Sequence, residues 1–309
     1  MSNVSACILS YNRADYLCAA IESILQQTVK PAEILIFDNG SHASVYEKVR
    51  PYMKRGVTWI GTEVNRSAVW NFQRAVATAK SEYLFVLHDD DRLCSDFTEQ
   101  QINYLSQNPD VGAVTCNGYL INDRGERTGR LLRQDAVAGE VEIYQSPAAV
   151  AIRYASDSCL PFSPVVYRAG FVRNQELREE YGKVVDAVFF CDLARVGVLA
   201  FQMRPLYECR VHGAQDSNYF PNIDLDCLNN YFESEADGSE VERKQLARQL
   251  VRQYTSRQLV KIYRSIFPAP RLPKLLSEIR SLGHHRFSFF TAICICLTAV
   301  HKRISGRKG

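Results

Sequence analysis

Short apolar runs alternate with stretches of helical spacing through the first part of the chain. A run of roughly four to eight apolar residues predicts a buried strand, and apolar side chains that recur every three or four positions predict one face of a helix. One predicted helix begins at Asp15, and three further predicted helices cover Ser44–Arg50, Ser67–Lys80 and Phe97–Gln107. The predicted strands are Val4–Ser10, Glu33–Phe37, Val57–Ile60, Tyr83–Leu87 and Val111–Cys116. This alternation indicates an α/β fold with a mainly parallel central sheet flanked by helices.

The pattern becomes less regular after Cys116. The residues of Asn122–Gly125 are typical of a hairpin turn, and we expect a loop over Arg130–Glu140. Further on, the spacing predicts helices over Pro147–Tyr154 and Val184–Val196, an extended segment over Cys159–Arg168, and strands over Val198–Met203 and Leu206–Val211.

A polar and acidic segment, Asp216–Glu240, divides the chain. We therefore expect an α/β domain over residues 1–217 and a mostly helical C-terminal extension over residues 218–309. Within the extension, Val241–Phe267 predicts a long helix that ends at a group of prolines, because proline lacks the N–H that a helix interior needs.

An apolar segment near the C-terminus predicts a further helix over residues 285–305. Phe287–Val300 contains no charged residue, and basic residues flank it on both sides. Its 14 residues are fewer than the ~18–20 that span a bilayer. The segment is either a helix that lies on a membrane surface, with its basic flanks drawn to anionic lipid, or a helix that docks on the domain or on a partner subunit and so forms an oligomer.

Composition and charge exclude several classes of protein. The 309 residues are 46% hydrophobic and 23% charged, which is ordinary for a globular protein. A net charge of only +3, without basic residues interleaved with aromatic ones, argues against nucleic acid as a partner. The 10 cysteines form no CxxC pair, which indicates a reducing compartment. The N-terminus lacks the features of a secretory signal, so we expect a cytoplasmic protein.

The most distinctive chemistry follows the strand Tyr83–Leu87, which runs directly into His88-Asp89-Asp90-Asp91. Adjacent carboxylates at the end of a buried strand repel one another, and their burial is costly unless a cation or water reaches them. Oxygen ligands suit Mg²⁺ or Mn²⁺, and these ions often bridge to phosphates. The alternative is a solvated acidic turn that opens the next helix.

Two other polar clusters also follow predicted strands. Tyr11-Asn12 comes after the first strand and Asp38-Asn39 after the second. In a parallel sheet the carboxyl ends of the strands share one edge, and ligands bind beyond that edge. Three polar clusters at this edge favour a metal–phosphate site over a solvated turn.

Together these motifs resemble the family 2 glycosyltransferases of the GT-A fold. The resemblance covers residues 1–217, and the order and spacing of its elements make it specific. The elements are Val4–Arg13, Asp38–Ser41, Asn65, Asn71-Phe72, His88–Asp91, Asp186 with Leu193 and Gly197, Tyr207–His212, and Ser217.

The resemblance implies an inverting, metal-dependent hexosyltransferase that moves a sugar from a nucleoside-diphosphate sugar to a hydroxyl of a glycan or lipid-linked acceptor. Surface polysaccharide assembly at the inner face of the cell membrane would be its setting. The implied metal ligands for Mg²⁺ or Mn²⁺ are Asp90, Asp91 and His212. The implied donor-binding residues are Ser10, Tyr11, Arg13, Asp38, Asn39, Asn65, Asn71 and Asp89.

Several of these positions have a plainer interpretation. Tyr11 could pack a turn, and Asp38 could form an Asx-turn that ends its strand. Arg210 either steadies the loop around His212 or forms a surface salt bridge. His88 departs from the family, which commonly has an acidic residue at that position.

The resemblance implies Asp186 as the catalytic base, which takes the proton of the acceptor hydroxyl. The family often has a second acid just before this residue, but Val185 stands there, so Asp192 is the alternative base. Asp186 could also simply cap a helix.

Two other functions remain open from the sequence. A nucleotidyltransferase would need a glycine-rich loop after the first strand, and Ser10–Arg13 has no glycine. A non-catalytic nucleotide-sugar-binding module is favoured only if Asp186 is dispensable.

Overall fold

The computed structural model describes residues 3–134, 137, 139–155, 160–213, 230–231, 233 and 239–248. The first elements are β1 (Val4–Ser10), α1 (Ala14–Leu25), β2 (Glu33–Asp38), α2 (Ala43–Met53), β3 (Val57–Ile60), α3 (Ala68–Thr78), β4 (Tyr83–His88), β5 (Arg92–Leu93) and α4 (Phe97–Gln107). The later elements are β6 (Val111–Ile121), β7 (Arg127–Leu131), β8 (Val141–Tyr144), α5 (Pro147–Ala155), β9 (Val165–Arg168), α6 (Ala169–Val172), the 3₁₀ helix η1 (Glu179–Val184), α7 (Val185–Val196) and β10 (Val198–Arg210).

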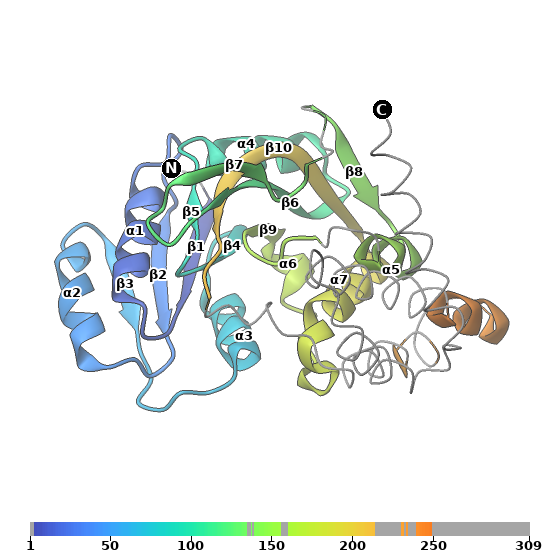
Figure 1. Cartoon of the computed structure of the whole chain (residues 1–309), viewed down its shortest axis with the longest axis horizontal. Helices are drawn as coiled ribbons and strands as arrows, with labels where there is room; N and C mark the ends of the chain where they lie inside the picture. Colours follow the sequence, from blue (N-terminus) through green and yellow to red (C-terminus); the bar gives the residue numbers. More distant parts are fainter. Residues whose placement is uncertain are drawn as a thin grey trace, which may run out of the picture. The chain divides into compact units, whose positions relative to one another are not determined.

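The strands form one central sheet in the order β3-β2-β1-β4-β9-β6-β10-β5, with β7 added to β6 and β8 to β10 (Figure 1). The predicted parallel arrangement is confirmed for β3, β2, β1 and β4. Beyond them, β9 runs antiparallel between β4 and β6, and β10 is parallel to β6. In β1, Ser10 pairs with Asp38 of β2 and Leu9 pairs with His88 of β4. The carboxyl ends of these three strands therefore lie at the same level of the sheet.

Alternation along each strand divides the side chains between two faces of the sheet. Val4, Ala6 and Ile8 of β1 pack in a core with apolar side chains of α1, α2 and α4. The intervening Cys7 faces α3, and its Sγ lies 4.0 Å from the carbonyl oxygen of Ala75. In β4, the odd-numbered residues join the first core, so the alternation carries His88 to the face that α3 covers.

The irregular part of the sequence departs from the predicted elements. β6 extends beyond Cys116 to Ile121, and β7 begins between the predicted turn and the predicted loop and overlaps the start of that loop. The sequence did not predict β7 because its side chains are mostly exposed and carry little apolar signal. The prediction of two late strands was wrong, since β10 is continuous through Pro205. There the pairing of β10 with β6 shifts register, and this irregularity accommodates a residue without an N–H.

The chain divides into two compact units, residues 1–150 with 160–220, and residues 151–159 with 221–309. In the second unit, residues 240–248 are helical, and Ser239 and Glu242 bond to each other's backbone N–H as in a capping box. This is where the long helix predicted from Val241 begins. The remainder of that helix, the predicted helix at 285–305 and Ser217 lie outside the described residues, and the boundary at residue 217 stays a prediction.

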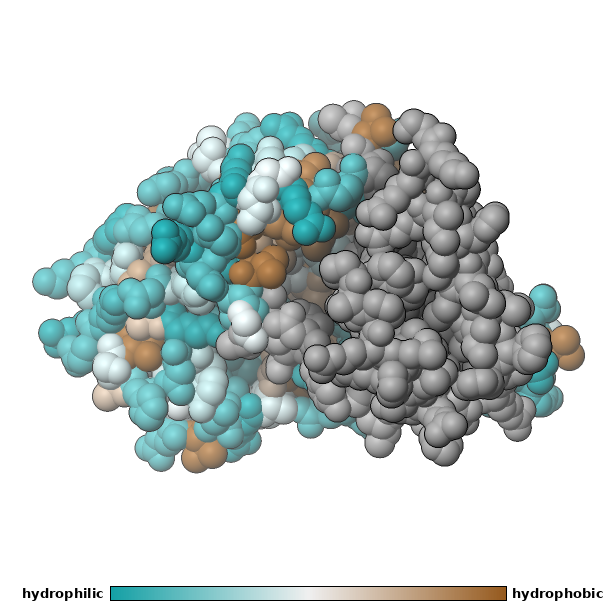
Figure 2. Space-filling model, in the orientation of Figure 1, coloured by the Kyte–Doolittle hydropathy of each residue, from teal (hydrophilic) through white to brown (hydrophobic). Residues whose placement is uncertain are grey.

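The described surface is largely hydrophilic on the face seen in Figure 2, with separate hydrophobic spots. The exposed large apolar side chains belong to different elements and include Tyr46 on α2, Val64 before α3 and Ile143 on β8. Within the part of the chain that the structure describes, no helix combines the length and the apolar character needed to cross a membrane.

Candidate active site

The loops after β1 and β4 are joined at the carboxyl edge of the sheet. Tyr11 donates its backbone N–H to Oδ2 of Asp89 over 3.0 Å, and Nη1 of Arg13 donates to Oδ1 of the same carboxylate over 3.0 Å. The same Nη1 lies 3.2 Å from Oδ2 of Asp90. Tyr11, Arg13 and Asp89 were all predicted to bind the donor, and in the structure Tyr11 and Arg13 both contact Asp89.

The three aspartates after β4 are buried, with Asp89 2%, Asp90 7% and Asp91 5% exposed. A solvated acidic turn would leave these carboxylates in water, so that alternative is wrong. The side chain of Asp91 is held from two segments of the chain: Oδ1 accepts the backbone N–H of Arg210 at the end of β10 over 3.0 Å, and Oδ2 lies 3.5 Å from Oγ of Ser163 in the loop before β9. Ser163 also accepts the backbone N–H of His88 over 3.0 Å.

Arg210 at the end of β10 is a buried structural residue. Its Nε donates to the carbonyl oxygen of Asp90, and its Nη1 donates to the carbonyl oxygens of Asn122 and Asp123. The guanidinium also lies over the ring of Tyr16, 4.3 Å from its centroid. Arg210 therefore fixes the aspartate turn against the β6–β7 hairpin, and the alternative of a surface salt bridge is wrong.

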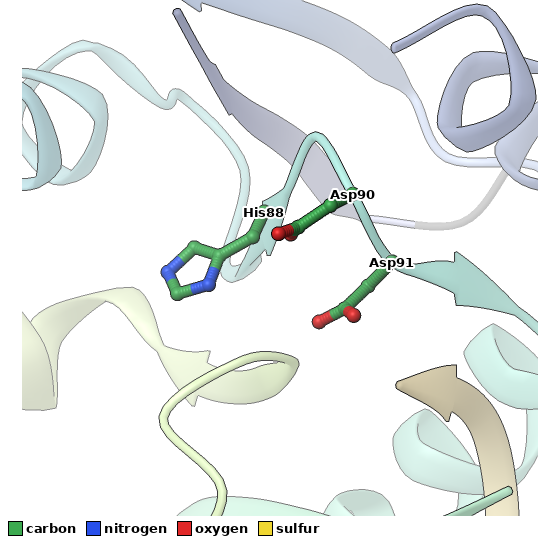
Figure 3. Close-up of side chains that lie close together, drawn as sticks. All are labelled: His88, Asp90 and Asp91. Carbon is green, nitrogen blue, oxygen red and sulfur yellow. The ribbon is translucent and has the colours of Figure 1, made fainter. Parts of the chain in front are cut away.

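His88, Asp90 and Asp91 offer ligand atoms that all lie within 4.8 Å of one another. Figure 3 shows their three side chains leaving the end of β4 toward the same side. His212, just after β10, contacts this group through Asp90, with 3.0 Å between its Nε2 and Oδ2 of Asp90. The structure thus brings together all three predicted metal ligands, Asp90, Asp91 and His212, and adds His88, for which the sequence predicted no role.

The charges at this site are only partly compensated. Burial raises the pKa of Asp89 to about 6 against the effect of Arg13, and burial together with Asp90 raises the pKa of Asp91 well above its usual range. Burial alone would also raise the pKa of Asp90. Three neighbours outweigh burial and hold this pKa below the usual value: His88 and Arg13 act through their charge, and His212 acts through its hydrogen bond. Burial also lowers the pKa of His88, which favours a neutral imidazole with a lone pair available to a metal.

This donor set fits a divalent cation. Two buried carboxylates and a neutral imidazole are ligands that Mg²⁺ and Mn²⁺ accept, with the imidazole better suited to Mn²⁺. A bound dication would also offset the burial and the repulsion from Asp90 that together raise the pKa of Asp91.

Asp38 ends β2 in an Asx-turn and still keeps one oxygen for a ligand. Its Oδ2 accepts the backbone N–H groups of Gly40 and Ser41 over 3.2 and 3.0 Å. Its Oδ1 is buried and has no partner among the residues that the structure describes, and the same holds for Oγ of Ser10. The turn interpretation and the ligand interpretation of Asp38 are therefore compatible, because each uses a different oxygen. The tight turn requires Gly40, whose φ is +78° and where a Cβ would lie 2.7 Å from the backbone N of Asn65.

The three predicted donor asparagines mainly hold the protein together. Asn39 donates from Nδ2 to Oδ1 of Asn65 over 2.8 Å and to the carbonyl of Arg66 over 2.7 Å, and its own Oδ1 accepts the N–H of Arg66. Asn71 donates to the carbonyl oxygen of Phe37 over 2.8 Å. These bonds tie α3 and the loop before it to the end of β2. In contrast, Tyr11 is 43% exposed at the edge of the site, which disfavours a packing role.

Asp186 lies in the first turn of α7, where its Oδ1 accepts the N–H of Ala187 over 2.8 Å. The next turn of α7 carries Phe189 and Phe190, whose rings pack on Phe162. The ring centroid of Phe162 also lies 6.3 Å from that of His88, so aromatic side chains connect α7 to the cluster of His88, Asp90 and Asp91. The alternative base, Asp192, forms ion pairs with Arg178 and Arg195 over 2.9 and 3.1 Å.

A mixed sheet that carries a buried acidic cluster and an unpartnered carboxylate oxygen at its strand ends is the arrangement expected of a GT-A fold glycosyltransferase. The sequence model of the family described as Glycosyl transferase family 2 matches residues 5–190, and the chain belongs to this family.

Relatives by sequence carry the same general description. An uncharacterized glycosyltransferase of Haemophilus influenzae is 23% identical over 227 residues, which cover 70% of this chain and 68% of the relative. An uncharacterized glycosyltransferase of Methanocaldococcus jannaschii is 29% identical over 126 residues, covering 40% of this chain and 43% of the relative.

Solved structures share the fold at low sequence identity. Residues 1–349 of S. aureus TarS, in complex with UDP-GlcNAc, superpose with a TM-score of 0.65 and 15% identity over 91% of this chain and 80% of that one. The mannosyltransferase PcManGT of Pyrobaculum calidifontis, in complex with GDP-Man and Mn²⁺, has a TM-score of 0.56 and 14% identity over 98% of this chain and 87% of that one.

Proposed function

We propose that this glycosyltransferase is an inverting, metal-dependent hexosyltransferase that uses a nucleoside-diphosphate sugar. The observation that carries the proposal is that two features lie at the same edge of the sheet, where β2 and β4 end. One is the buried cluster of His88, Asp90 and Asp91, and the other is the unpartnered Oδ1 of Asp38. The first suits a metal-bound diphosphate, and the second suits a nucleobase. Solved relatives of the fold hold UDP-GlcNAc or GDP-Man with Mn²⁺, which supports a donor of this class.

A uridine nucleotide fits Asp38 best. Because Oδ2 already accepts two backbone N–H groups, a single acceptor, Oδ1, is left for the base. The N3–H of uracil needs one acceptor, whereas the N1–H and amino group of guanine together need two. Tyr11 is exposed beside this position and can cover the face of the base.

His88, Asp90 and Asp91 would hold Mg²⁺ or Mn²⁺, with His212 bonded to Asp90 behind them. When bound, the metal supplies positive charge for the diphosphate that departs in the reaction. Arg13 can add a second cationic group, since a guanidinium binds phosphate oxygens in pairs.

Asp186 is the proposed base. A carboxylate within hydrogen-bond reach of the acceptor hydroxyl removes its proton as the oxygen attacks the anomeric carbon. Attack from the face opposite the departing diphosphate inverts the configuration of that carbon. The position of Asp186 one turn before Phe189 and Phe190, which pack on Phe162, supports a place near the cluster.

A glycan or lipid-linked acceptor, used in surface polysaccharide assembly at the inner membrane face, fits the basic and apolar segment 285–305. Deletion of residues 284–309 would then reduce recovery of the protein with membranes. Unchanged fractionation would count against a lipid-linked acceptor reached through this segment.

The direct test is a thermal-unfolding screen of nucleoside diphosphates and nucleotide sugars with Mn²⁺. UDP and one UDP-sugar should raise the midpoint of thermal unfolding to the full extent only when Mn²⁺ is present. Asp90→Ala should remove the part of this stabilisation that depends on the metal. Asp110→Ala, which changes an exposed aspartate, is the control. Stabilisation by nucleoside triphosphates but not by nucleotide sugars would favour a nucleotidyltransferase, and binding without transfer to any acceptor would favour a binding module.

A further inference from the structure

Arg13 forms ion pairs with two carboxylates of the acidic turn. Its Nη1 lies 3.0 Å from Asp89 and 3.2 Å from Asp90. The two carboxylates are nearly buried, whereas the Arg13 side chain is 37% exposed. The guanidinium is therefore the more exposed partner, and the two carboxylates have further contacts, Asp89 with the N–H of Tyr11 and Asp90 with His212.

We propose that Arg13 is an internal counter-cation that competes with the divalent metal for the acidic turn until the donor binds. On this view the diphosphate draws Arg13 away from Asp89 and Asp90, and the metal then binds with full affinity. This inference rests on the proposed metal-dependent use of a nucleotide sugar. It adds to that function an energetic coupling between metal and donor that passes through one named side chain.

The physical basis is simple electrostatics. A dication bound at Asp90 would lie next to the Arg13 guanidinium, and two cations at contact distance in a partly buried site repel strongly. A diphosphate offers more negative charge than one carboxylate and matches the planar fork of the guanidinium. Arg13 gains a better partner when the donor arrives, so metal and donor each improve the binding of the other.

The test measures binding of Mn²⁺ alone, of UDP alone and of each in the presence of the other, by isothermal titration calorimetry. For the wild-type protein we expect weak Mn²⁺ binding that UDP strengthens strongly. Arg13→Gln should bind Mn²⁺ at least about fivefold more tightly without UDP, since the repulsion is gone. It should bind UDP more weakly, so that the coupling factor between the two ligands falls. Arg13→Lys keeps the charge and should keep the wild-type affinity for Mn²⁺ alone.

Arg204→Gln is the matched control, because Arg204 also pairs with an aspartate, Asp96, but on the exposed part of β10. It should leave all four measurements unchanged. The inference is overturned if Arg13→Gln binds Mn²⁺ alone with unchanged or weaker affinity while UDP and Mn²⁺ still bind the wild-type protein. If the wild-type protein binds neither UDP nor Mn²⁺ in any combination, the proposed function itself fails.

Discussion

Nε2 of His212 lies 3.0 Å from Oδ2 of Asp90, although 122 residues separate them in the sequence. The contact links the end of β10 to the acidic turn after β4. Asp90 also belongs to the compact cluster with His88 and Asp91, so two histidines meet at one aspartate. Their roles need not be equal, because a metal ligand must offer a lone pair, while a residue that orients the ligand only needs an N–H.

Substitutions of the two histidines should separate these roles. His88→Ala and His88→Gln should both weaken Mn²⁺ binding in the presence of UDP by about 10–100-fold, because the flexible and weakly basic amide of glutamine is a poorer ligand than a fixed imidazole. His212→Ala should weaken binding by a similar factor, but His212→Gln should recover most of it, since its amide N–H can still bond to Asp90. Calorimetric titration of Mn²⁺ checks this. Equal losses for His212→Gln and His212→Ala would make His212 a direct ligand.

The regular part of the fold could be predicted because its strands are buried on both faces and leave a strong apolar signal. The prediction for Val4–Ser10, for example, matches β1 residue for residue, and nearly all of that strand is buried. Where strands are exposed or very short, as in β7 (Arg127–Leu131) and β5 (Arg92–Leu93), the sequence carries no such signal. These strands form because β6 and β10 offer them unpaired edges, which a local pattern does not reveal.

The site was predictable as a set of strand ends, but the partner of each side chain was not. Asn39 and Asn65 were both expected to contact the donor, yet their side chains bond to each other. His88 had no expected role because its departure from the family pattern hid its position on the strand. The alternation of β4 offered the missing signal, since it directs His88 to the face that α3 covers.

Asp38→Asn should change the preferred base. The carboxamide oxygen can keep the two bonds from Gly40 and Ser41, which leaves its NH₂ group in the place of Oδ1. That group donates to N3 of cytosine but opposes N3–H of uracil. We expect UDP affinity to fall at least about tenfold and CDP affinity to exceed it, because a mismatched buried polar pair is costly.

Calorimetry with UDP and CDP in the presence of Mn²⁺ measures this exchange, and Asp110→Asn at an exposed position serves as the control. If UDP remains preferred at wild-type affinity, Asp38 does not read the base.

Arg210→Met should destabilise the protein as well as the site. The substitution leaves the carbonyl oxygens of Asp90, Asn122 and Asp123 without their buried donor. We expect the free energy of unfolding to fall by about 2–4 kcal/mol, because buried acceptors lose their partners. Urea unfolding measures the change. Arg204→Met, on an exposed arginine of the same strand, should shift it by less than about 0.5 kcal/mol, and similar shifts for both variants would contradict the structural role of Arg210.

Asp186→Asn tests the base and separates an enzyme from a binding module. The variant should bind the donor and Mn²⁺ within about threefold of the wild-type affinity and lose about 10²–10⁴-fold in kcat, because proton removal is lost while donor contacts remain. Asp192→Asn is the matched comparison on the same helix. Its carboxylate pairs with Arg178 and Arg195, so we expect it to lower the free energy of unfolding by about 1–2 kcal/mol and to retain transfer. The rate of sugar transfer to an acceptor, measured for each variant with the sugar nucleotide found in the thermal screen, decides which aspartate is the base. If Asp186→Asn keeps its rate and Asp192→Asn loses it, the base is Asp192 and the two ion pairs must open during the reaction.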